Sequence, residues 1–356
     1  MNKQNKLYID VHVLQTVPPS CINRDDTGSP KTAVYGGVTR ARVSSQAWKR
    51  AMRLMFHDFF SPDQIGFRTK HAVQLVAEEL NKAGVEKNAE KQAVQALEAA
   101  GLKVNKELKT DALLFLSPAQ AKALAELSAA GETDKQRYKD ALKEYPSIDM
   151  ALFGRMVASD PSLNYDAAVQ VAHSISTHEV HNEYDYFTAV DDCSPEDNAG
   201  AGHIGTVEFH SATLYRYTTI NVGELARHLK GDTAEAVEGY IRAFLLSMPT
   251  GKQNTFANRT VPDLAYVALR WDQPVNLAGA FEHPVRSDGN GFVSNSVRAL
   301  SRYALGVYQS FAETPEQAFC IGLEPAEELA PSVSMQDMLK KARETVEEYC
   351  KTEEEK

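Results

Sequence analysis

The sequence is poor in the features that mark secreted, disulfide-stabilised or membrane-spanning proteins. Its four cysteines, Cys21, Cys193, Cys320 and Cys350, are scattered and form no C-x-x-C pair, which disfavours both a disulfide scaffold and a zinc ribbon. No apolar run approaches the length of a membrane span. The first residues, MNKQNKLYID, contain no signal-peptide core. We therefore expect a cytoplasmic protein without a membrane partner.

Motifs for common catalytic chemistry are also lacking. No P-loop, Ser/His/Asp triad or paired-carboxylate site is recognisable. Residues 200–205 (GAGHIG) match G-x-G-x-x-G, but an acidic loop precedes them and a strand-like run follows, so we reject a dinucleotide site. Residues 178–181 (HEVH) fall one residue short of H-E-x-x-H. We expect His173, His178 and His181 to be core or surface residues, and we expect neither a cofactor nor a metal ion.

The most informative absence is local. Residues 27–57 contain no Asp or Glu although the chain has 48 of them, and the overall composition predicts roughly four acidic residues in such a window. The same window holds six Lys and Arg. The formal net charge of the chain is −10, which leaves −16 for the remainder. A cationic segment on an acidic protein favours a polyanion as its partner.

The cationic segment leads into a predicted helix. Ser44 or Ser45 can cap its N-terminus, and the helix is expected to continue through AWKRAMRLMFHDFF. We expect this helix to have an apolar stripe, formed by Trp48, Met52, Met55 and Phe59. We expect its polar face to carry Gln46, Lys49, Arg50 and Arg53. Free N–H groups and the helix dipole favour anions at such an end. Gly36 and Gly37 would let a ligand approach the backbone closely.

Strand and helix patterns mix without regular βαβ alternation, which is typical of an α+β fold. Residues 7–14 alternate as a half-buried strand does, and residues 15–42 read as irregular. Residues 64–145 are rich in Ala, Leu, Glu and Lys and predict a helical insertion. The remaining pattern predicts helices at 164–180, 235–246, 295–312 and 335–350, and strands at 206–220 and 264–271.

Two further polar segments have an alternative structural explanation. In NRDD, Asp25 and Asp26 offer adjacent carboxylates that could hold Mg²⁺ in a nuclease centre. Without a third convergent carboxylate, a turn in which these side chains bond local backbone is favoured. The polar loop at residues 251–263 carries Lys252 and Arg259, which could contact a nucleic-acid backbone or belong to an ordinary connector.

Two long blocks, HVLQTVPPSCINRDD and YGGVTRARVSSQAWKRAMR, closely resemble the start of the backbone subunit of the type I-E CRISPR Cascade complex, the CasC family. Further matches follow in the same order and cover most of the chain: ALFGRM, AHSISTHEV, DYFTAVDD, HIGTVEF, YRYTTINV and GKQNTFA. The Ala-rich insertion and the C-terminal end resemble the family least. One departure is that Val38 and Thr39 stand where the family has further basic residues.

The resemblance implies a ferredoxin-like, RRM-related palm with a helical fingers insertion and a β-hairpin thumb. The implied divisions are 1–61 for the first part of the palm with its RNA-gripping loop and helix, 62–148 for the fingers, 149–181 for the palm and web, 182–215 for the thumb, and 216–356 for the second part of the palm and the C-terminal helices. The implied role is a non-catalytic scaffold. Several copies would stack along one CRISPR RNA, together with other Cascade subunits, and present it for pairing with target DNA.

The resemblance also implies which residues bind the guide RNA. The grip falls on Arg24, Lys31, Ser44, Gln46, Lys49 and Arg53, with Arg40, Arg42 and Arg50 as adjacent candidates. Apart from the resemblance, Ser45 at the helix end and Lys252 in the polar loop are further candidates. Each thumb would displace a nucleotide bound to the next subunit. Met156 is a candidate apolar wedge beside that nucleotide, and Ile204 is a weaker candidate in the thumb.

Two other functions remain open at this point. Related backbone subunits of type III complexes cut target RNA through an aspartate in a loop after the first strand, where Asp25 and Asp26 stand here. The alternative is therefore a metal-dependent ribonuclease. A scaffold built from protein alone, with no polyanion, is the third possibility, and it predicts assembly that Lys49→Glu and Arg53→Glu leave unchanged.

Overall fold

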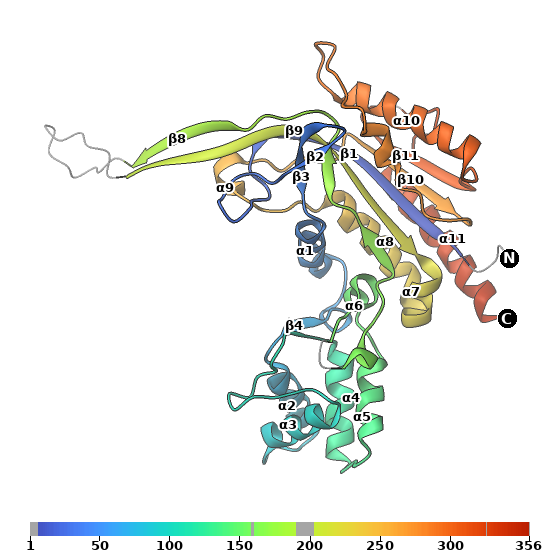
Figure 1. Cartoon of the computed structure of the whole chain (residues 1–356). Coiled ribbons are helices and arrows are strands. Elements are labelled where there is room, and N and C mark those ends of the chain that lie inside the picture. The colour runs from blue at the N-terminus through green and yellow to red at the C-terminus, as the bar shows by residue number, and fades with distance from the viewer. Residues whose placement is uncertain (1–5, 158–159, 190–202, 325, 356) are drawn as a thin grey trace, which may run out of the picture.

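A large antiparallel sheet with helices on both faces forms the body of the protein (Figure 1). A two-stranded ribbon extends from one side of this body, and a helical insertion projects from another (Figure 1). The computed structural model describes residues 6–157, 160–189, 203–324 and 326–355. Within these ranges, no helix is long and apolar enough to cross a bilayer.

The main sheet has the strand order β11-β10-β1-β9-β7-β3-β2, with β6 and β8 also paired to β9. Its strands are β1 (Tyr8–Ser20), β2 (Thr32–Tyr35), β3 (Val38–Val43), β6 (Val169–Val171), β7 (Ser174–Ser176), β8 (Glu183–Ala189), β9 (His203–Asn221), β10 (Leu264–Arg270) and β11 (Gln317–Gly322). All pairings are antiparallel. The segments β6, β7 and β8 pair one after another along β9, and β8 with the first part of β9 forms the ribbon.

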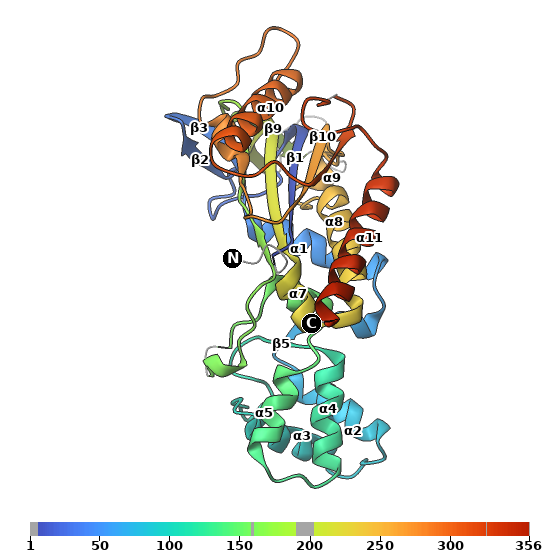
Figure 2. The same ribbon diagram turned by 90° about the vertical axis from the view of Figure 1, so that its right-hand side faces the viewer.

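The α-helices of the body cover both faces of this sheet (Figure 2). They are α1 (Ser45–Met55), α6 (Ile148–Phe153), α7 (Val222–Leu229), α8 (Thr233–Leu246), α9 (Gln253–Phe256), α10 (Val293–Ser310) and α11 (Met335–Glu354). Alternation along β1 explains the two cores, because successive side chains point to opposite faces. Ile9 and Val11 pack with residues of α1, α8 and α11. Leu14 packs on the other face with residues of α10.

The helical insertion has a hydrophobic core of its own. It contains α2 (Ala72–Lys82), α3 (Ala89–Ala99), α4 (Pro118–Ala129), α5 (Lys135–Lys143) and the small pair β4 (Phe67–Thr69) and β5 (Leu114–Leu116). Alanines and leucines fill the contacts between its helices. The helices therefore lie within residues 64–145, as the composition predicts.

Several predicted elements are confirmed with small shifts at their ends, namely α8, β9, β10, α10 and α11. The first strand and the first helix are also present, but β1 extends six residues beyond the predicted end and α1 ends at Met55, before the predicted FHDFF. The irregular segment predicted at 15–42 is confirmed only for residues 21–31; the rest is wrong, because β1 continues to Ser20 and the hairpin of β2 and β3 begins at Thr32. Gly36 and Gly37 form the two-residue turn of that hairpin with φ of 61° and 80°, which is the backbone of a type I′ turn. The backbone at this pair therefore serves the turn, and a Cβ on Gly36 would clash with the Glu282 carbonyl.

The helix predicted at 164–180 is also wrong. This segment forms the short strands β6 and β7, because their backbone groups pair with the long strand β9. Pairing with an existing strand outweighs a weak local helix preference. Residues 190–202 lie outside the described residues, and with them most of the acidic loop and the first half of the GAGHIG motif.

Strand β1 carries two buried titratable side chains, Asp10 and His12, two positions apart. The Asp10 carboxylate accepts hydrogen bonds from the Tyr217 hydroxyl (2.9 Å) and the Val275 N–H (2.8 Å). Burial raises the pKa of Asp10 to about 6. His12 shares a 2.8 Å hydrogen bond with the Tyr215 hydroxyl, and burial lowers its pKa to about 3. Asp10 therefore gains a proton on folding near pH 5, whereas His12 loses one.

Asp10 is expected to make the fold less stable as the pH rises. Its pKa is 3.8 when exposed and about 6 when buried, so the native state binds the extra proton in this window and stability falls as pH increases through it. Asp10→Asn removes this dependence. The free energy of unfolding of the wild type, relative to Asp10→Asn, should fall by about 2 kcal/mol between about pH 4.5 and 6.5. Denaturant titrations at several pH values measure the difference. Asp111→Asn, at an exposed carboxylate, is the control, and a pH-independent difference for Asp10→Asn would contradict the expectation.

Candidate nucleic-acid interface

The polar face of α1 borders an open cleft of about 800 Å³. One wall is α1 itself, and the other is the base of the helical insertion together with the segment that follows α6. The cleft is lined by Gln46, Lys49, Arg50, Arg53, Arg68, Leu113, Phe115, Phe153, Gly154, Arg155, Met156, Asn164, Tyr165, Asp166 and Ala167. The structure thus brings five of the predicted RNA-binding residues into one place: Gln46, Lys49, Arg50, Arg53 and Met156.

The cations of this cleft differ in how far they are compensated: Arg53 pairs with Asp149, and Asp166 also lines the cleft. Lys49 lies with its Nζ 5.9 Å from the centre of the Phe153 ring, and burial lowers its pKa. Arg50 is exposed. In the part of the chain that the structure describes, neither Lys49 nor Arg50 forms an ion pair. A partly desolvated cation without a counter-charge favours an anionic ligand.

Phe115 gives the cleft an aromatic platform for two arginines. The guanidinium of Arg53 lies 4.8 Å from the ring centre, and that of Arg68 lies 6.0 Å from it. Arg68 is exposed and belongs to β4 in the insertion. Charge spacing in the sequence does not point to Arg68, because it lies outside the cationic segment and only the fold brings it to α1.

Asp149 fixes the position of α1 against the insertion. Its fully buried carboxylate accepts hydrogen bonds from Arg53 Nε (2.9 Å), the Gly66 N–H (2.9 Å) and the Ser147 hydroxyl (2.7 Å). Gly66 and Ser147 stand at the two ends of the insertion, so one carboxylate joins both ends to α1. A side chain at residue 66 would not fit, because a Cβ there would lie 2.5 Å from Ser147 Oγ and 2.8 Å from the Phe115 ring.

Arg155 holds the opposite wall. Its buried guanidinium donates to the carbonyl groups of Leu142, Leu163 and Phe115 and to Gln120 Oε1, which joins the insertion to the segment after α6. Burial lowers the pKa of Arg155 to about 10, so it stays charged at neutral pH. The next residue, Met156, is 85% exposed. A rigid neighbour thus presents an apolar side chain to the cleft.

Polar groups at the N-terminus of α1 are largely used within the fold. Ser44 Oγ accepts from the Ala47 N–H as the helix cap, and the Ser45 N–H donates to His173 Nδ1. Both serines are buried. Burial, with Arg42 and Lys31 nearby, lowers the pKa of His173, so the neutral ring can accept this bond. Lys31 and Arg42 therefore gather beside this end of α1, but the serines act first as structural residues.

The structure gives Arg40 a different role from the predicted phosphate contact. Its side chain is fully buried. The guanidinium donates to the carbonyl groups of Tyr35, Ser176 and Phe281 at 2.9–3.1 Å and, more weakly, to that of Glu282. No donor of this guanidinium faces solvent, so Arg40 holds the β2–β3 hairpin on the body.

The loop after β1 forms a second polar surface. Asp25 Oδ1 accepts from the Thr27 N–H, the Thr27 hydroxyl and the Ser29 N–H, and these bonds lower its pKa. The local turn predicted for Asp25 is therefore present. Arg24 is exposed in the same loop. Burial raises the pKa of Cys21, and the charges of Arg24 and Lys252 oppose this rise. Both cations therefore act near Cys21, and neither lines the cleft.

Ile204 belongs to β9 in the ribbon, whereas Met156 follows α6. Figure 1 shows the ribbon projecting away from α6. Ile204 is 66% exposed on the ribbon, where it pairs with Thr188. The ribbon also exposes Tyr184 and Tyr186. Of the three histidines, His178 is buried, accepts from the Thr213 N–H and stacks on Phe292. Among the described residues, no group of three His, Cys, Asp or Glu is arranged to hold a metal ion.

Lys49→Ala tests the cleft as a phosphate grip. We expect roughly tenfold weaker binding of single-stranded RNA, equal for unrelated sequences, and a salt dependence that is flatter by about one unit of slope. Fluorescence anisotropy at several salt concentrations measures both. The matched control is Lys341→Ala, which removes another lysine above a phenylalanine ring (5.4 Å) but on α11. A loss that depends on RNA sequence would contradict the grip.

Comparisons with known proteins show the family and the fold of this chain. The sequence profile of the CT1975-like protein family matches residues 9–350. A chain from a structure described as "CRISPR RNA-guided surveillance complex, pre-nicking" is similar with 32% identity and a TM-score of 0.81, over 94% of this chain and 100% of that one. A chain from another "CRISPR RNA-guided surveillance complex" is 29% identical with a TM-score of 0.63, over 94% and 99%. The comparison with curated proteins gives no match.

The profile match spans nearly the whole chain, and the first of these structural matches covers the other chain completely. The chain therefore belongs to the CT1975-like family of CRISPR-associated (Cas) proteins, and it shares its fold with chains of CRISPR RNA-guided surveillance complexes.

Proposed function

We propose that this protein is a non-catalytic backbone subunit of a CRISPR RNA-guided surveillance complex of the type I-E Cascade kind. The observation that carries the proposal is the cleft in which Lys49, Arg50 and Arg53 converge with the exposed Met156. Cations aimed at phosphates, with few groups suited to reading bases, bind a guide of any sequence. Base pairing of that guide would then select the target DNA.

The division into palm, fingers and thumb is part of the same proposal. The four strands β10-β1-β9-β7 lie in the spatial order fourth, first, third and second along the chain, with α1 and α8 in the two crossovers. This order supports a ferredoxin-like palm. The insertion that carries α2 to α5 would be the fingers, and the ribbon of β8 and β9 would be the thumb.

The placement of Met156 and Ile204 on different segments supports assembly from several copies. One chain exposes Met156 at its cleft and Ile204 on its ribbon, and the ribbon projects away from α6, which Met156 follows (Figure 1). Exposed apolar side chains on a projecting ribbon mark a contact surface. In a head-to-tail row along one RNA, the ribbon of one copy would bring Ile204 to the cleft of the next.

Purification from the native host, or with the neighbouring genes of its operon, tests this role. We expect the protein to carry RNA of uniform length with repeat-derived ends, in a complex with several copies of itself. Lys49→Glu should reduce the recovered RNA, because it places an acid where phosphate would lie. Assembly without RNA, unaffected by Lys49→Glu, would show a protein-only scaffold and contradict the proposal.

The same preparation separates binding from cleavage. We expect target RNA to remain intact with Mg²⁺, and Asp25→Ala to change neither cleavage nor guide binding, since Asp25 serves a local turn. Mg²⁺-dependent cutting that is lost in Asp25→Ala or Asp26→Ala would instead establish the ribonuclease.

A further inference from the structure

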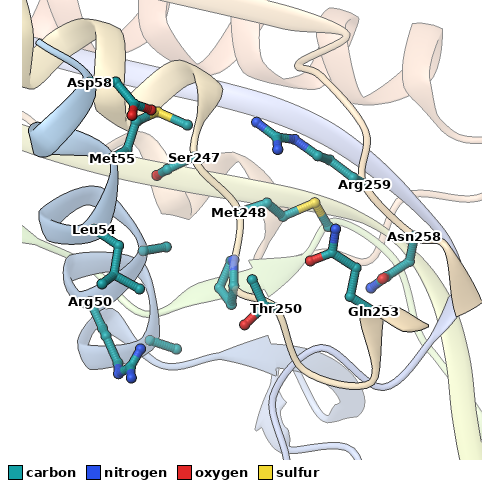
Figure 3. A pocket seen from close by; sticks show the side chains of 13 residues that line it. Arg50, Leu54, Met55, Asp58, Ser247, Met248, Thr250, Gln253, Asn258 and Arg259 are labelled. Carbon is teal, nitrogen blue, oxygen red and sulfur yellow. The ribbon is translucent and has the colours of Figure 1, made fainter. Parts of the chain in front are cut away.

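A second pocket lies beside the cleft, between α1 and the segment that leads from the end of α8 to β10 (Figure 3). Its volume is about 330 Å³, at the lower end of the range for small-molecule sites, which is ~300–1,000 Å³. The lining residues on the α1 side are Ala47, Arg50, Ala51, Leu54, Met55 and Asp58. Those on the other side include Ser247, Met248, Thr250, Gln253, Asn258 and Arg259.

Two buried polar groups of this pocket have no partner. The Ser247 hydroxyl and the Asn258 side-chain nitrogen are shielded from water, and neither forms a hydrogen bond with any described residue. Both residues are only 2% exposed. In Figure 3 the Ser247 oxygen points toward α1, and the Asn258 amide points toward Gln253. Buried polar groups are normally paired, so two orphans in one pocket indicate a missing hydrogen-bonding ligand.

The rest of the lining indicates what the ligand is. Met248, Met55 and Leu54 offer apolar walls that suit a flat ring. Gln253 and Asn258 carry amides, which pair well with the edges of nucleobases. Arg50 and Arg259 supply positive charge, and neither forms an ion pair within the described ranges. Asp58 is the acidic lining residue and lies about two helical turns from Arg50. Together these groups suit a base with an attached phosphate.

The pocket and the cleft share one lining residue, Arg50. Arg50 therefore stands where a strand held along Gln46, Lys49 and Arg53 would pass the mouth of the pocket. We propose that this pocket receives one unpaired nucleotide of the RNA strand held in the cleft. Its base meets Ser247 and Asn258, and its phosphate meets Arg50 and Arg259. This proposal rests on the RNA-binding role proposed above.

The first experiment uses two small probes on the full chain: adenosine 5′-monophosphate, and ribose 5-phosphate, which lacks the base. Calorimetry measures both affinities. The wild type should bind the nucleotide at least tenfold more tightly than the sugar phosphate, because only the nucleotide has a base to satisfy Ser247 and Asn258. Equal affinity for the two probes would overturn the base site.

Variants locate the binding and separate it from stability. Ser247→Ala and Asn258→Ala should each weaken nucleotide binding roughly fivefold to tenfold. Ser247→Ala should not lower the melting temperature, because it removes a hydroxyl that has no partner in the free protein. Arg259→Gln should weaken both probes. Arg302→Gln, at an exposed arginine of α10, is the matched control and should weaken neither probe. Nucleotide binding unchanged in all the pocket variants would overturn the proposal.

The same variants distinguish this proposal from the function on which it rests. RNA oligonucleotide binding that depends on Lys49, but is equal in wild type and Ser247→Ala, would contradict the nucleotide pocket and support RNA binding in the cleft. Absence of RNA binding by the wild type would contradict both the nucleotide pocket and the proposed RNA-binding role. Loss of self-association in Ser247→Ala, with no nucleotide bound by the wild type, would assign the pocket to a second copy of the chain and also overturn the proposal.

Discussion

One buried carboxylate sets the geometry on which the candidate interface depends. Asp149 accepts hydrogen bonds from Arg53 on α1 and from Gly66 and Ser147 at the two ends of the insertion. A buried carboxylate without its partners is strongly destabilising, so these three groups stay together. The distance between α1 and the insertion, and therefore the width of the cleft, follows from this bond set. Gly66 is required because any Cβ would clash with Ser147 and Phe115.

The cations of the body and of the cleft divide into two kinds. Arg40 and Arg155 are buried and donate to backbone carbonyl groups, which fixes the hairpin and the far wall of the cleft. Lys49 and Arg50 have no such partners among the described residues and remain available to an anion. Arg53 belongs to both kinds, since it holds Asp149 and stacks on Phe115 at the cleft. Structural arginines thus give the binding cations a rigid support.

The sequence predicted the cationic face of α1 because a charge pattern with helical spacing needs only local information. It also predicted the helical insertion and the strand character of β9 and β10. It could not separate Arg40 from Lys49, because burial depends on residues such as Phe281 that lie far along the chain. β6 and β7 were misread as a helix because their strand pairing is supplied by β9. Asp149, Arg68 and the orphaned Ser247 gave no signal, since each matters only through contacts that the fold creates.

Asp149→Asn tests most directly whether this carboxylate builds the cleft. The substitution removes a negative charge near the cleft but keeps an oxygen for the Gly66 N–H. Electrostatic attraction alone therefore predicts tighter RNA binding. A positioning role for Asp149 predicts the opposite, because Arg53 and α1 lose the group that holds them: RNA affinity should fall, and the free energy of unfolding should fall by about 2 kcal/mol. Anisotropy titrations and denaturant unfolding measure the two. Unchanged stability with tighter RNA binding would contradict the claim that Asp149 builds the cleft.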